Sequence, residues 1–380
     1  MDRWLALAAT LAALTIPGVP SADSDEPETT LDREDGRFRS PRRLQKLDPE
    51  QAAMIERLEA LGYAQGVVDA GAFEGVTVHD RARAQAGYNL VTSGHAQVVQ
   101  LMDMDGAVLH EWRADFSMIW PEMAHKADLE QAVFFRRAYL LDDGGILAIY
   151  EGFGMLRLDR DSKVLWSRKN LAHHDLQVLE DGTLVVLTRK AHLVPRINPD
   201  KPILEDFVSW LDLDTGEDLR EPISLLECFE NSEEFRPILE AHPLRAGDLF
   251  HTNGLEVLDG RVDHPAFAAG NLLVSFSKLH AVGVADPVRQ EMVWVLRDDF
   301  KRQHDPRILD DGTLMLFDNR GVNFDGGKGL EELSRVLTYD PKTKERRWSY
   351  EGDAEHPFYT RTCGTNQRLP GGNTLITESD

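Results

Sequence analysis

The sequence predicts an all-β protein, folded as a six-bladed β-propeller with a short helical extension at its N-terminus and an incomplete last blade. Two observations lead to this prediction. From about Gly87 onward, short β-branched and leucine-rich segments alternate with Asp-Gly turns, and little of the chain has the period of a long helix. The segments also recur as units of roughly 40–60 residues with about four strands each, a repeat typical of propellers.

Each unit begins at a turn with a glycine, continues into an apolar strand, and often ends near a tryptophan. The six predicted starts lie near Gly87, Asp142, Glu180, Gly270, Asp310 and Arg368. The closing tryptophans are Trp112, Trp166, Trp294 and Trp348. Only one clear strand follows the last start, so we expect an incomplete sixth blade. Either the N-terminal region completes it or, as we favour, the chain has been shortened.

The N-terminal region predicts export. Residues 1–22 combine a charged start, an apolar stretch and a small-residue end, which is the pattern of a secretory signal peptide. The alternative is an anchor that stays attached. Residues 23–85 would form an acidic leader and one amphipathic helix, with Asp48 as its N-cap, Pro49 in its first turn and Gly62 as its stop. The propeller domain would span residues 86–380, in a periplasmic or secreted protein.

The charge balance excludes some partners. The chain of 380 residues has 42 Lys+Arg and 65 Asp+Glu, for a formal net charge of −23. A general nucleic-acid or anionic-membrane binder needs a basic face, which this composition disfavours. An anionic substrate would therefore need a local cluster of cations. Cys228 and Cys363 are the only cysteines, without metal-type spacing, and their pairing is left open.

Histidines recur at one point of the repeat. The segments "HHDLQVLEDGTL" and "QHDPRILDDGTL" place His174 and His304 eight residues before Gly182 and Gly312. His251, in "HTNGLEVLDG", fits the same pattern with one extra residue. Because the innermost strand of every blade lines the central channel, equivalent residues converge there. We therefore expect the three imidazoles to form a ring at one mouth of the channel.

Two further positions complete the expected ring. The matching point of the second unit holds Arg136 or Arg137, and in the last unit it falls near Gly364. His173 should point to the opposite face from His174, because side chains alternate along a strand. Such a ring could bind a transition metal, or it could supply a nucleophile with acid–base helpers. A purely structural role, in which repeated residues tie neighbouring blades, is the simpler reading.

The motifs resemble those of the bacterial arylsulfate sulfotransferases, which are periplasmic six-bladed propellers. The resemblance covers about Gly87 to the end and rests on the segments "HHDLQVLEDGTLVV", "HTNGLEVL", "NLLVSFSKLHAVGVAD", "QHDPRILDDGTLMLFDNRG" and "GTNQRLPGGNTLI". It implies transfer of a sulfuryl group from an aryl sulfate to a phenol through a sulfated histidine, with no nucleotide donor, cofactor or metal. It also implies that His304 is the nucleophile, while His251 and His174 contact the sulfate or move the phenol proton.

One position departs from the family pattern. The family normally has an arginine where this chain has Ser277, and the next residue is Lys278. A lysine is a point charge and lacks the bidentate fork that arginine offers a sulfate. We therefore expect Arg137, Lys278 and Arg320 to supply the substrate-binding charge. Asp305 either fixes the His304 tautomer or, as we favour, forms a turn before Pro306.

Two alternatives from other classes stay open. One is a non-catalytic propeller that acts as a binding module, for which Ser277 is the best support. The other is a metal-dependent propeller hydrolase of the lactonase kind, although sites for hard cations use Asp, Asn and Glu rather than His. Under the preferred interpretation the partners are an aryl sulfate donor and a phenol acceptor, with no nucleic acid and no stable membrane insertion. A homodimer is left open.

Overall fold

The computed structural model describes residues 33–34, 37–38, 47–59, 75–129, 132–320, 333–353, 356, 358–360 and 362–379. The chain divides into two compact units, Met1–Asp48 and Pro49–Asp380. In the first unit, β1 (Arg33–Glu34) and β2 (Arg37–Phe38) form an antiparallel pair. The predicted signal peptide lies outside the described residues, as does Gly62.

The second unit begins with the amphipathic helix that the sequence predicts. Helix α1 (Pro49–Glu59) starts at the expected proline, and its Gln51 side chain donates a hydrogen bond to the Asp200 carbonyl at 3.3 Å. The helix contacts β11 (Thr183–His192) and β12 (Ile203–Asp212), which belong to the third sheet of the repeat.

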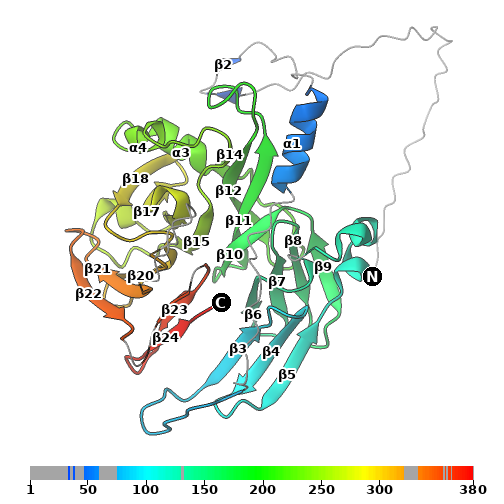
Figure 1. Cartoon of the computed structure of the whole chain (residues 1–380), viewed down its shortest axis with the longest axis vertical. Coiled ribbons are helices and arrows are strands. Elements are labelled where there is room, and N and C mark those ends of the chain that lie inside the picture. Colours follow the sequence, from blue (N-terminus) through cyan, green and yellow to red (C-terminus); the bar gives the residue numbers. More distant parts are fainter. Residues whose placement is uncertain are drawn as a thin grey trace, which may run out of the picture. The chain divides into compact units, whose positions relative to one another are not determined.

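Five antiparallel sheets follow one another along the chain, each with its strands in sequence order (Figure 1). Blade one contains β3 (Tyr88–Thr92), β4 (Val98–Asp103) and β5 (Val108–Arg113). Blade two contains β6 (Arg137–Leu140), β7 (Ile146–Tyr150), β8 (Gly154–Leu158) and β9 (Val164–Arg168). Blade three contains β10 (Ala172–Val178), β11, β12, β13 (Ile223–Ser224) and β14 (Gly247–Asp248), of which β14 pairs with β12 in parallel.

The last two blades each have four strands. Blade four contains β15 (Thr252–Val257), β16 (Leu272–Phe276), β17 (Ala281–Asp286) and β18 (Glu291–Leu296). Blade five contains β19 (His304–Ile308), β20 (Leu314–Asp318), β21 (Arg335–Tyr339) and β22 (Arg346–Glu351). The described helical segments between strands are short: α2 (Phe116–Ile119), η1 (Pro121–Lys126), α3 (Leu225–Asn231), α4 (Arg236–Glu240), η3 (Pro265–Phe267) and η4 (Ser277–Leu279).

The all-β, propeller-like prediction is confirmed, but the prediction of six blades is wrong. Within the described residues, five sheets have three or more strands. The sixth predicted unit forms only a hairpin, β23 (Thr365–Arg368) and β24 (Thr374–Thr377). The sequence count was based on turn glycines, which mark the start of a unit but do not establish how many strands follow.

The core lies between the blades, because the second strands of blades two to five are buried on both faces. Along β11, Leu184 and Val186 pack in a cluster with blade two, whereas Val185 and Leu187 pack in a cluster with blade four. This alternation is the period of two that a strand imposes on its side chains. It explains why the central strands read as continuous apolar runs rather than as alternating ones.

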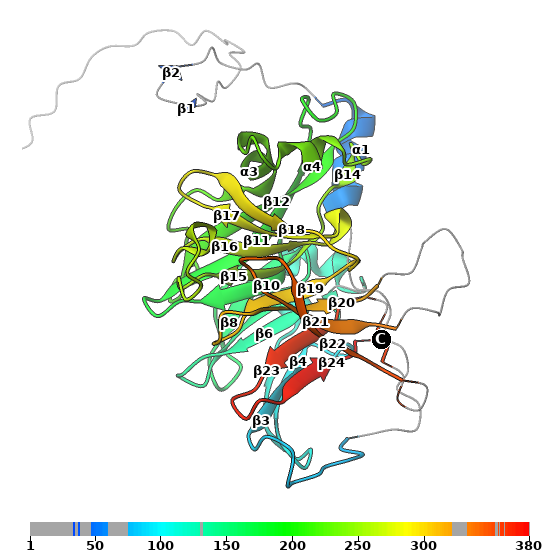
Figure 2. The same ribbon diagram turned by 90° about the vertical axis from the view of Figure 1, so that its left-hand side faces the viewer.

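The innermost strands meet around a common centre. Strand β10 contacts β15, β15 contacts β19, β19 contacts β23, and β3 contacts β6. The C-terminal hairpin is held to the segment that precedes β3, since Gly371 N–H donates to Gln85 Oε1 at 2.9 Å and Asn373 Nδ2 donates to the Arg83 carbonyl at 2.8 Å. Figure 2 shows the hairpin in the same region of the molecule as β3 and β4.

Two remaining expectations concern cysteines and membranes. Cys228 is buried and Cys363 is partly exposed, and both are free thiols. None of the helices in the described part of the chain has the length and apolarity needed to cross a bilayer.

Candidate active site

The sheets from blade two to the C-terminal hairpin share one register around their first turn. In the β10–β11 hairpin, Val178 pairs with Leu184, the second residue after Gly182. The turn glycine has a φ of 82°, a left-handed conformation that glycine adopts without strain. The other four hairpins have the same pairing, so counting back four residues from the paired position reaches the same point of each innermost strand. The residues at this point are Arg136, His174, Asn253, His304 and Gly364.

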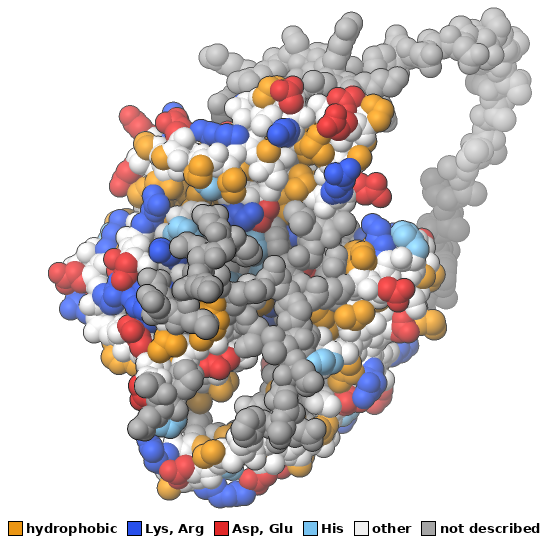
Figure 3. Space-filling view, viewed as in Figure 1, with side chains coloured by type: hydrophobic (Ala, Val, Ile, Leu, Met, Phe, Trp, Pro, Cys, Tyr) orange, Lys and Arg blue, Asp and Glu red, His pale blue; other side chains and the backbone are white. Residues whose placement is uncertain are grey.

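All five equivalent residues line a cavity of about 1780 Å³. Its wall also includes apolar and aromatic side chains, among them Tyr88 from blade one and Met315 and Trp348 from blade five. The space-filling view shows a hollow in the region between β3–β4 and the β23–β24 hairpin, with charged and apolar side chains intermixed around it (Figure 3). The cavity therefore combines a polar centre with an apolar wall, which suits a ligand with an anionic head and an aromatic body.

The structure brings the three predicted histidines together. The ring centroids of His174 and His251 lie 5.2 Å apart, and those of His174 and His304 lie 6.5 Å apart. In the strand register, however, Asn253 rather than His251 is equivalent to the other two histidines. His251 stands two residues earlier, just before β15, and has a left-handed φ of 50°. Asn253 was missed in the sequence because the connection between β15 and β16 is longer than in the other blades: Gly270 lies 17 residues after Asn253, whereas Gly182 lies eight residues after His174.

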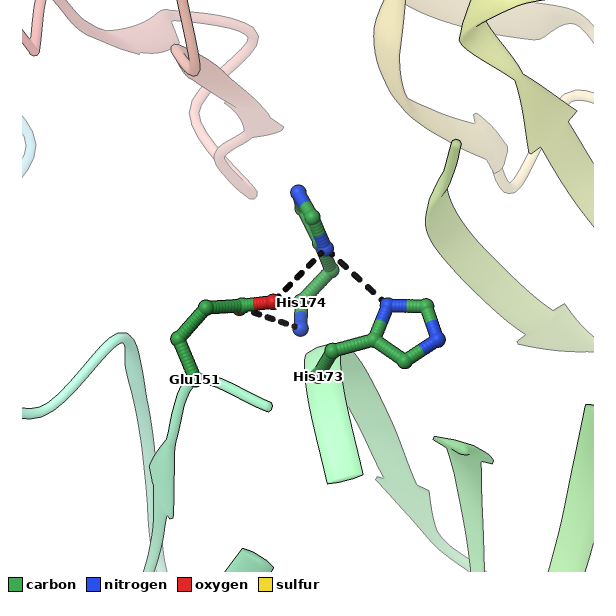
Figure 4. Close-up of side chains that lie close together, drawn as sticks. All are labelled: Glu151, His173 and His174. Atoms are coloured by element: carbon green, nitrogen blue, oxygen red, sulfur yellow. Dashed lines mark hydrogen bonds and ion pairs between the residues drawn. The ribbon is translucent and has the colours of Figure 1, made fainter. Parts of the chain in front are cut away.

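The expectation for His173 is wrong. It should point away from His174, but the Nδ1 atoms of the two imidazoles lie 3.0 Å apart (Figure 4). The reason is that His174 has a left-handed φ of 51°, at an irregularity of the β10–β11 register, so the alternation of a regular strand is broken there. His174 lines the cavity, whereas His173 is fully buried behind it.

The surroundings of His304 determine which nitrogen carries its hydrogen. The Nδ1 atom lies 2.9 Å from the Arg302 carbonyl and 2.7 Å from Asn319 Oδ1. Because a carbonyl can only accept, Nδ1 is the donor and Nε2 keeps its lone pair. Burial, and then the positive charge of Arg136, lowers the pKa of His304 to about 3. His304 is therefore neutral at pH 7, with Nε2 available as a nucleophile.

His251 is oriented by an acid in the same way. Its Nδ1 donates to Asp248 Oδ2 at 2.9 Å, and Lys278 Nζ lies 2.7 Å from the same oxygen. Although burial alone would raise the pKa of Asp248, His251 and Lys278 hold it below its ordinary value. Lys278, predicted to bind substrate, thus offsets the charge of Asp248 and is not among the residues that line the cavity.

Comparison with known protein families gives one match. A family model described as "Arylsulfotransferase (ASST)" matches residues 137–380, which include His174, His251 and His304. The chain belongs to the arylsulfotransferase family. The match covers well over half of the chain. No curated protein matches the chain significantly.

Solved structures give weaker likenesses. A protein of unknown function from Bacteroides caccae is 13% identical, with a TM-score of 0.49, over 77% of this chain and 83% of that chain. BamB from Moraxella catarrhalis is 10% identical, with a TM-score of 0.36, over 80% and 73%. The WD40 propeller domain of Doa1 is 11% identical, with a TM-score of 0.37, over 61% and 58%. Likenesses with such low TM-scores give no information about the function of this chain.

Within this arylsulfotransferase-family site, the two arginines of blade two have different surroundings. Arg136 occupies the equivalent point of the ring and lines the cavity, with Nε 3.7 Å from Glu151. Arg137, the predicted substrate ligand, also lines the cavity but pairs with Asp175 at 3.1 Å. Arg307 lies 2.8 Å from both Asp175 and Asp305. Arg137 therefore belongs to a neutralised network, whereas Arg136 contributes its charge to the histidines.

The acid that follows each repeated histidine holds the next blade. Asp175 Oδ2 accepts from the Leu255 N–H at 2.9 Å, and Asp305 Oδ2 accepts from the Asn366 N–H at 3.0 Å. Asp305 has a left-handed φ of 49°. The acceptors that fix the His304 tautomer are Asn319 and a backbone carbonyl, so the structure gives Asp305 a role in assembly instead.

Two other predicted site residues, Arg320 and His251, are not among the residues that line the cavity. Arg320 NH2 is 3.6 Å from Glu351 Oε1, on the outermost strand of blade five. Ser277, at the family's arginine position, is buried, and its N–H donates to the His251 carbonyl at 3.2 Å. The departure from the family pattern thus lies directly beside His251.

One group of side chains has the donor set of a metal site. Ligand atoms of Glu151, His173 and His174 all lie within 4.8 Å of one another (Figure 4). The Glu151 carboxylate, however, has the guanidinium groups of Arg136 and Arg189 at 3.7 Å each. Two positive charges against one carboxylate disfavour a further cation, so the electrostatics of this point favour an anion over a metal.

Proposed function

We propose that this protein is an arylsulfotransferase that moves a sulfuryl group from an aryl sulfate to a phenol by way of a sulfated His304. The observation that carries the proposal is the fixed tautomer of His304 in a cavity lined by Arg136. A neutral imidazole, with Nδ1 donating and Nε2 free, is the form that can attack an electrophile.

In the first half-reaction, His304 Nε2 attacks the sulfur in line and the bond from sulfur to the phenol oxygen breaks. The phenol takes a proton from His174, which lines the cavity, or from His251, whose ring centroid lies 5.2 Å from that of His174. The nucleophilic ring becomes an N-sulfo-imidazolium, and its Nδ1 hydrogen remains on Asn319 Oδ1 and the Arg302 carbonyl. In the second half-reaction, an acceptor phenol attacks the same sulfur, gives its proton back, and restores the neutral imidazole.

Two groups are placed to stabilise the charge on the sulfuryl oxygens. Arg136 lines the cavity and lowers the pKa of both His174 and His304, next after the effect of their burial. Asn253 is 5% exposed, and neither of its side-chain polar atoms has a hydrogen-bond partner among the described residues. A buried amide in this state needs a partner, and its N–H groups suit a sulfate oxygen.

The apolar wall of the cavity supports aromatic substrates, and its volume leaves room for the donor or acceptor ring beside the ring of histidines. We further propose that the protein acts outside the cytoplasm, on the strength of the signal-peptide pattern in residues 1–22.

The test is a transfer assay with 4-nitrophenyl sulfate, with and without an added phenol. We expect phenol-dependent release of nitrophenolate by the wild type and a loss of about 10⁴-fold or more in His304→Ala. His356→Ala is the matched control, because His356 is exposed and lies outside the cavity wall. Mass spectrometry under alkaline conditions should find one added sulfuryl group on His304 before phenol is added.

Two results would contradict the proposal. Release that is equally fast without an acceptor would indicate a hydrolase. Sulfate binding without any turnover would favour the second candidate, a binding module. That candidate is supported by one observation: Lys278, the residue next to the family's arginine position, is engaged with Asp248.

A further inference from the structure

A chain of buried polar groups runs away from the cavity behind His174. The His173 and His174 rings approach edge to face, with centroids 5.3 Å apart and Nδ1 atoms 3.0 Å apart (Figure 4). One of these two nitrogens must donate and the other must accept, since both rings are buried and burial lowers the pKa of each well below its ordinary value. The tautomers of the two imidazoles are therefore coupled.

The far side of His173 meets a carboxyl group. His173 Nε2 lies 3.4 Å from Asp206 Oδ1, on β12, and the side chains are 0% and 1% exposed. Neither atom makes a hydrogen bond in the described part of the chain, and each is the other's charged or polar neighbour in this close contact. Buried polar atoms without partners are costly, so each of these atoms is the partner that the other needs. The side chains of Asp206, His173 and His174, in this spatial order, thus connect the protein interior to the cavity.

We propose that Asp206 and His173 form a proton relay that lets His174 act as an acid in one half-reaction and as a base in the other. This inference rests on the proposed function. In one state, Asp206 is protonated and donates to His173 Nε2, His173 Nδ1 donates to His174 Nδ1, and His174 Nε2–H points its hydrogen toward the substrate. In the other state, all three hydrogen bonds are reversed, Asp206 is a carboxylate, and His174 Nε2 carries a lone pair.

The relay balances the protons of both half-reactions. When the donor phenol leaves, His174 Nε2 gives it a proton, His174 Nδ1 takes one from His173, and His173 Nε2 takes one from Asp206. The site then holds the sulfo-imidazolium of His304 and the Asp206 carboxylate. When the acceptor phenol attacks, its proton enters at His174 Nε2 and the same shifts run backward, so that Asp206 is protonated again. No imidazolium persists on His173 or His174 in either state.

The charges around Asp206 suit a group that changes its protonation state. Burial, and then the nearby Asp248 carboxylate, raises the pKa of Asp206 well above its ordinary value. Two groups oppose this: the Thr252 N–H donates to Asp206 Oδ2 at 3.3 Å, and the charge of Arg189 favours the carboxylate. Burial and the Asp248 carboxylate thus favour the protonated form of Asp206, and the Thr252 N–H and Arg189 favour the carboxylate.

The test is the dependence of the rate on the leaving phenol. The donor series is 4-nitrophenyl, 4-chlorophenyl, phenyl and 4-methylphenyl sulfate, whose leaving phenols become steadily less acidic. Asp206→Asn keeps the size of the side chain but cannot deliver a proton. We expect kcat/KM of this variant to stay close to that of the wild type with 4-nitrophenyl sulfate, and to fall by about 10²-fold or more with phenyl and 4-methylphenyl sulfate.

Glu205→Gln is the matched control. Glu205 is a buried acid on the same strand, next to Asp206, but it faces His192 and Ser224 instead of the histidine cluster. This variant should keep the wild-type dependence on the leaving phenol. If Asp206→Asn lowers kcat/KM by one constant factor across the series, or leaves it unchanged, the relay is wrong while the proposed function stands. If the wild type transfers nothing from any of the four donors, the proposed function itself fails.

A second measurement uses only the wild type and so does not depend on the folding of a variant. In mixtures of H₂O and D₂O, kcat/KM for phenyl sulfate should follow a curved proton inventory, because three hydrogens move together. A straight line would show that a single proton moves in this step and would overturn the relay.

Discussion

Asn319 Oδ1 accepts the Nδ1 hydrogen of His304 across 2.7 Å, and the other contacts of the Asn319 amide determine that its oxygen faces the imidazole. Its Nδ2 donates to the carbonyls of Thr360 and Cys363, at 3.1 and 2.9 Å, so Oδ1 must face the imidazole. Asn319 is fully buried, and 15 residues separate it from His304 in sequence. The Asn319 amide, which directly follows β20, therefore helps to determine that Nε2 is the reactive nitrogen of His304.

Replacing this amide should slow the formation of sulfohistidine. We expect Asn319→Leu to lower the single-turnover rate with 4-nitrophenyl sulfate about tenfold, since one neutral hydrogen bond is lost while the Arg302 carbonyl remains. The affinity for the donor should change little. A rate equal to that of the wild type in a folded variant would show that the carbonyl alone fixes the tautomer.

Arg136 and Arg137 offer a matched pair of substitutions. Arg136→Lys should lower kcat/KM for aryl sulfates by about 10- to 100-fold, because a lysine cannot replace the bidentate contact of a guanidinium with an anion. Arg137→Lys should lower it by less than about tenfold, since Arg137 is already paired with Asp175. The measurement is kcat/KM of both variants for aryl sulfates. Equal losses in the two variants would contradict the assignment of Arg136 as the sulfate ligand.

Acid should destabilise the protein through its buried histidines. The pKa of His304 falls from 6.5 to about 3 on folding, so between these values the unfolded chain binds a proton that the folded chain does not. The stabilisation is complete above pH 6.5 and is lost as the pH falls toward 3, at up to about 1.4 kcal/mol per pH unit. Urea unfolding at pH 7 and pH 5 should show a smaller loss in His304→Gln than in the wild type. His356→Gln should behave like the wild type, and an unchanged difference in both variants would refute the buried, neutral state of His304.

Lys278 should control the protonation of His251. Its charge lowers the pKa of His251, as does burial, whereas Asp248 raises it. We therefore expect Lys278→Met to raise the pKa of His251 and to move the acidic limb of the pH–rate profile to higher pH. Lys163→Met, at an exposed position of blade two, is the control and should leave the profile where it is. A profile that does not move in Lys278→Met would mean that His251 does not titrate in catalysis.

The repeat pattern was sufficient to predict the sheets and the convergence of His174, His251 and His304, because turn glycines and apolar runs are local signals. It failed where the outcome depended on partners distant in sequence. The number of turns predicted six blades, but only a hairpin follows the last one. Regular alternation predicted that His173 would point away from His174, whereas the left-handed backbone of His174 brings the rings together.

Two other site residues depend on contacts that local sequence does not show. Asp206, on β12, reaches His173 from two strands away, and its immediate sequence does not distinguish it from other polar strand residues. Asn319 follows β20 within a motif segment, but its contact with His304 depends on the pairing of β19 with β20. Arg136 could have been identified by counting back eight residues from Gly144, as for His174 and His304. Asn253 could not, because a longer connection between β15 and β16 places Gly270 17 residues after it. The choice between Arg136 and Arg137 required the ion pair with Asp175, which only the structure shows.

The hydrogen bonds from Asp175 and Asp305 to the next innermost strand have a consequence for how the site is prepared. Each aspartate directly follows a histidine of the ring, so these bonds fix the backbone that carries the imidazole against the next innermost strand. The conformational entropy of ordering these rings is therefore lost once, when the protein folds, and not again at every turnover. A substitution of either aspartate would appear in kinetics as a catalytic defect, although its origin would be a loosened scaffold.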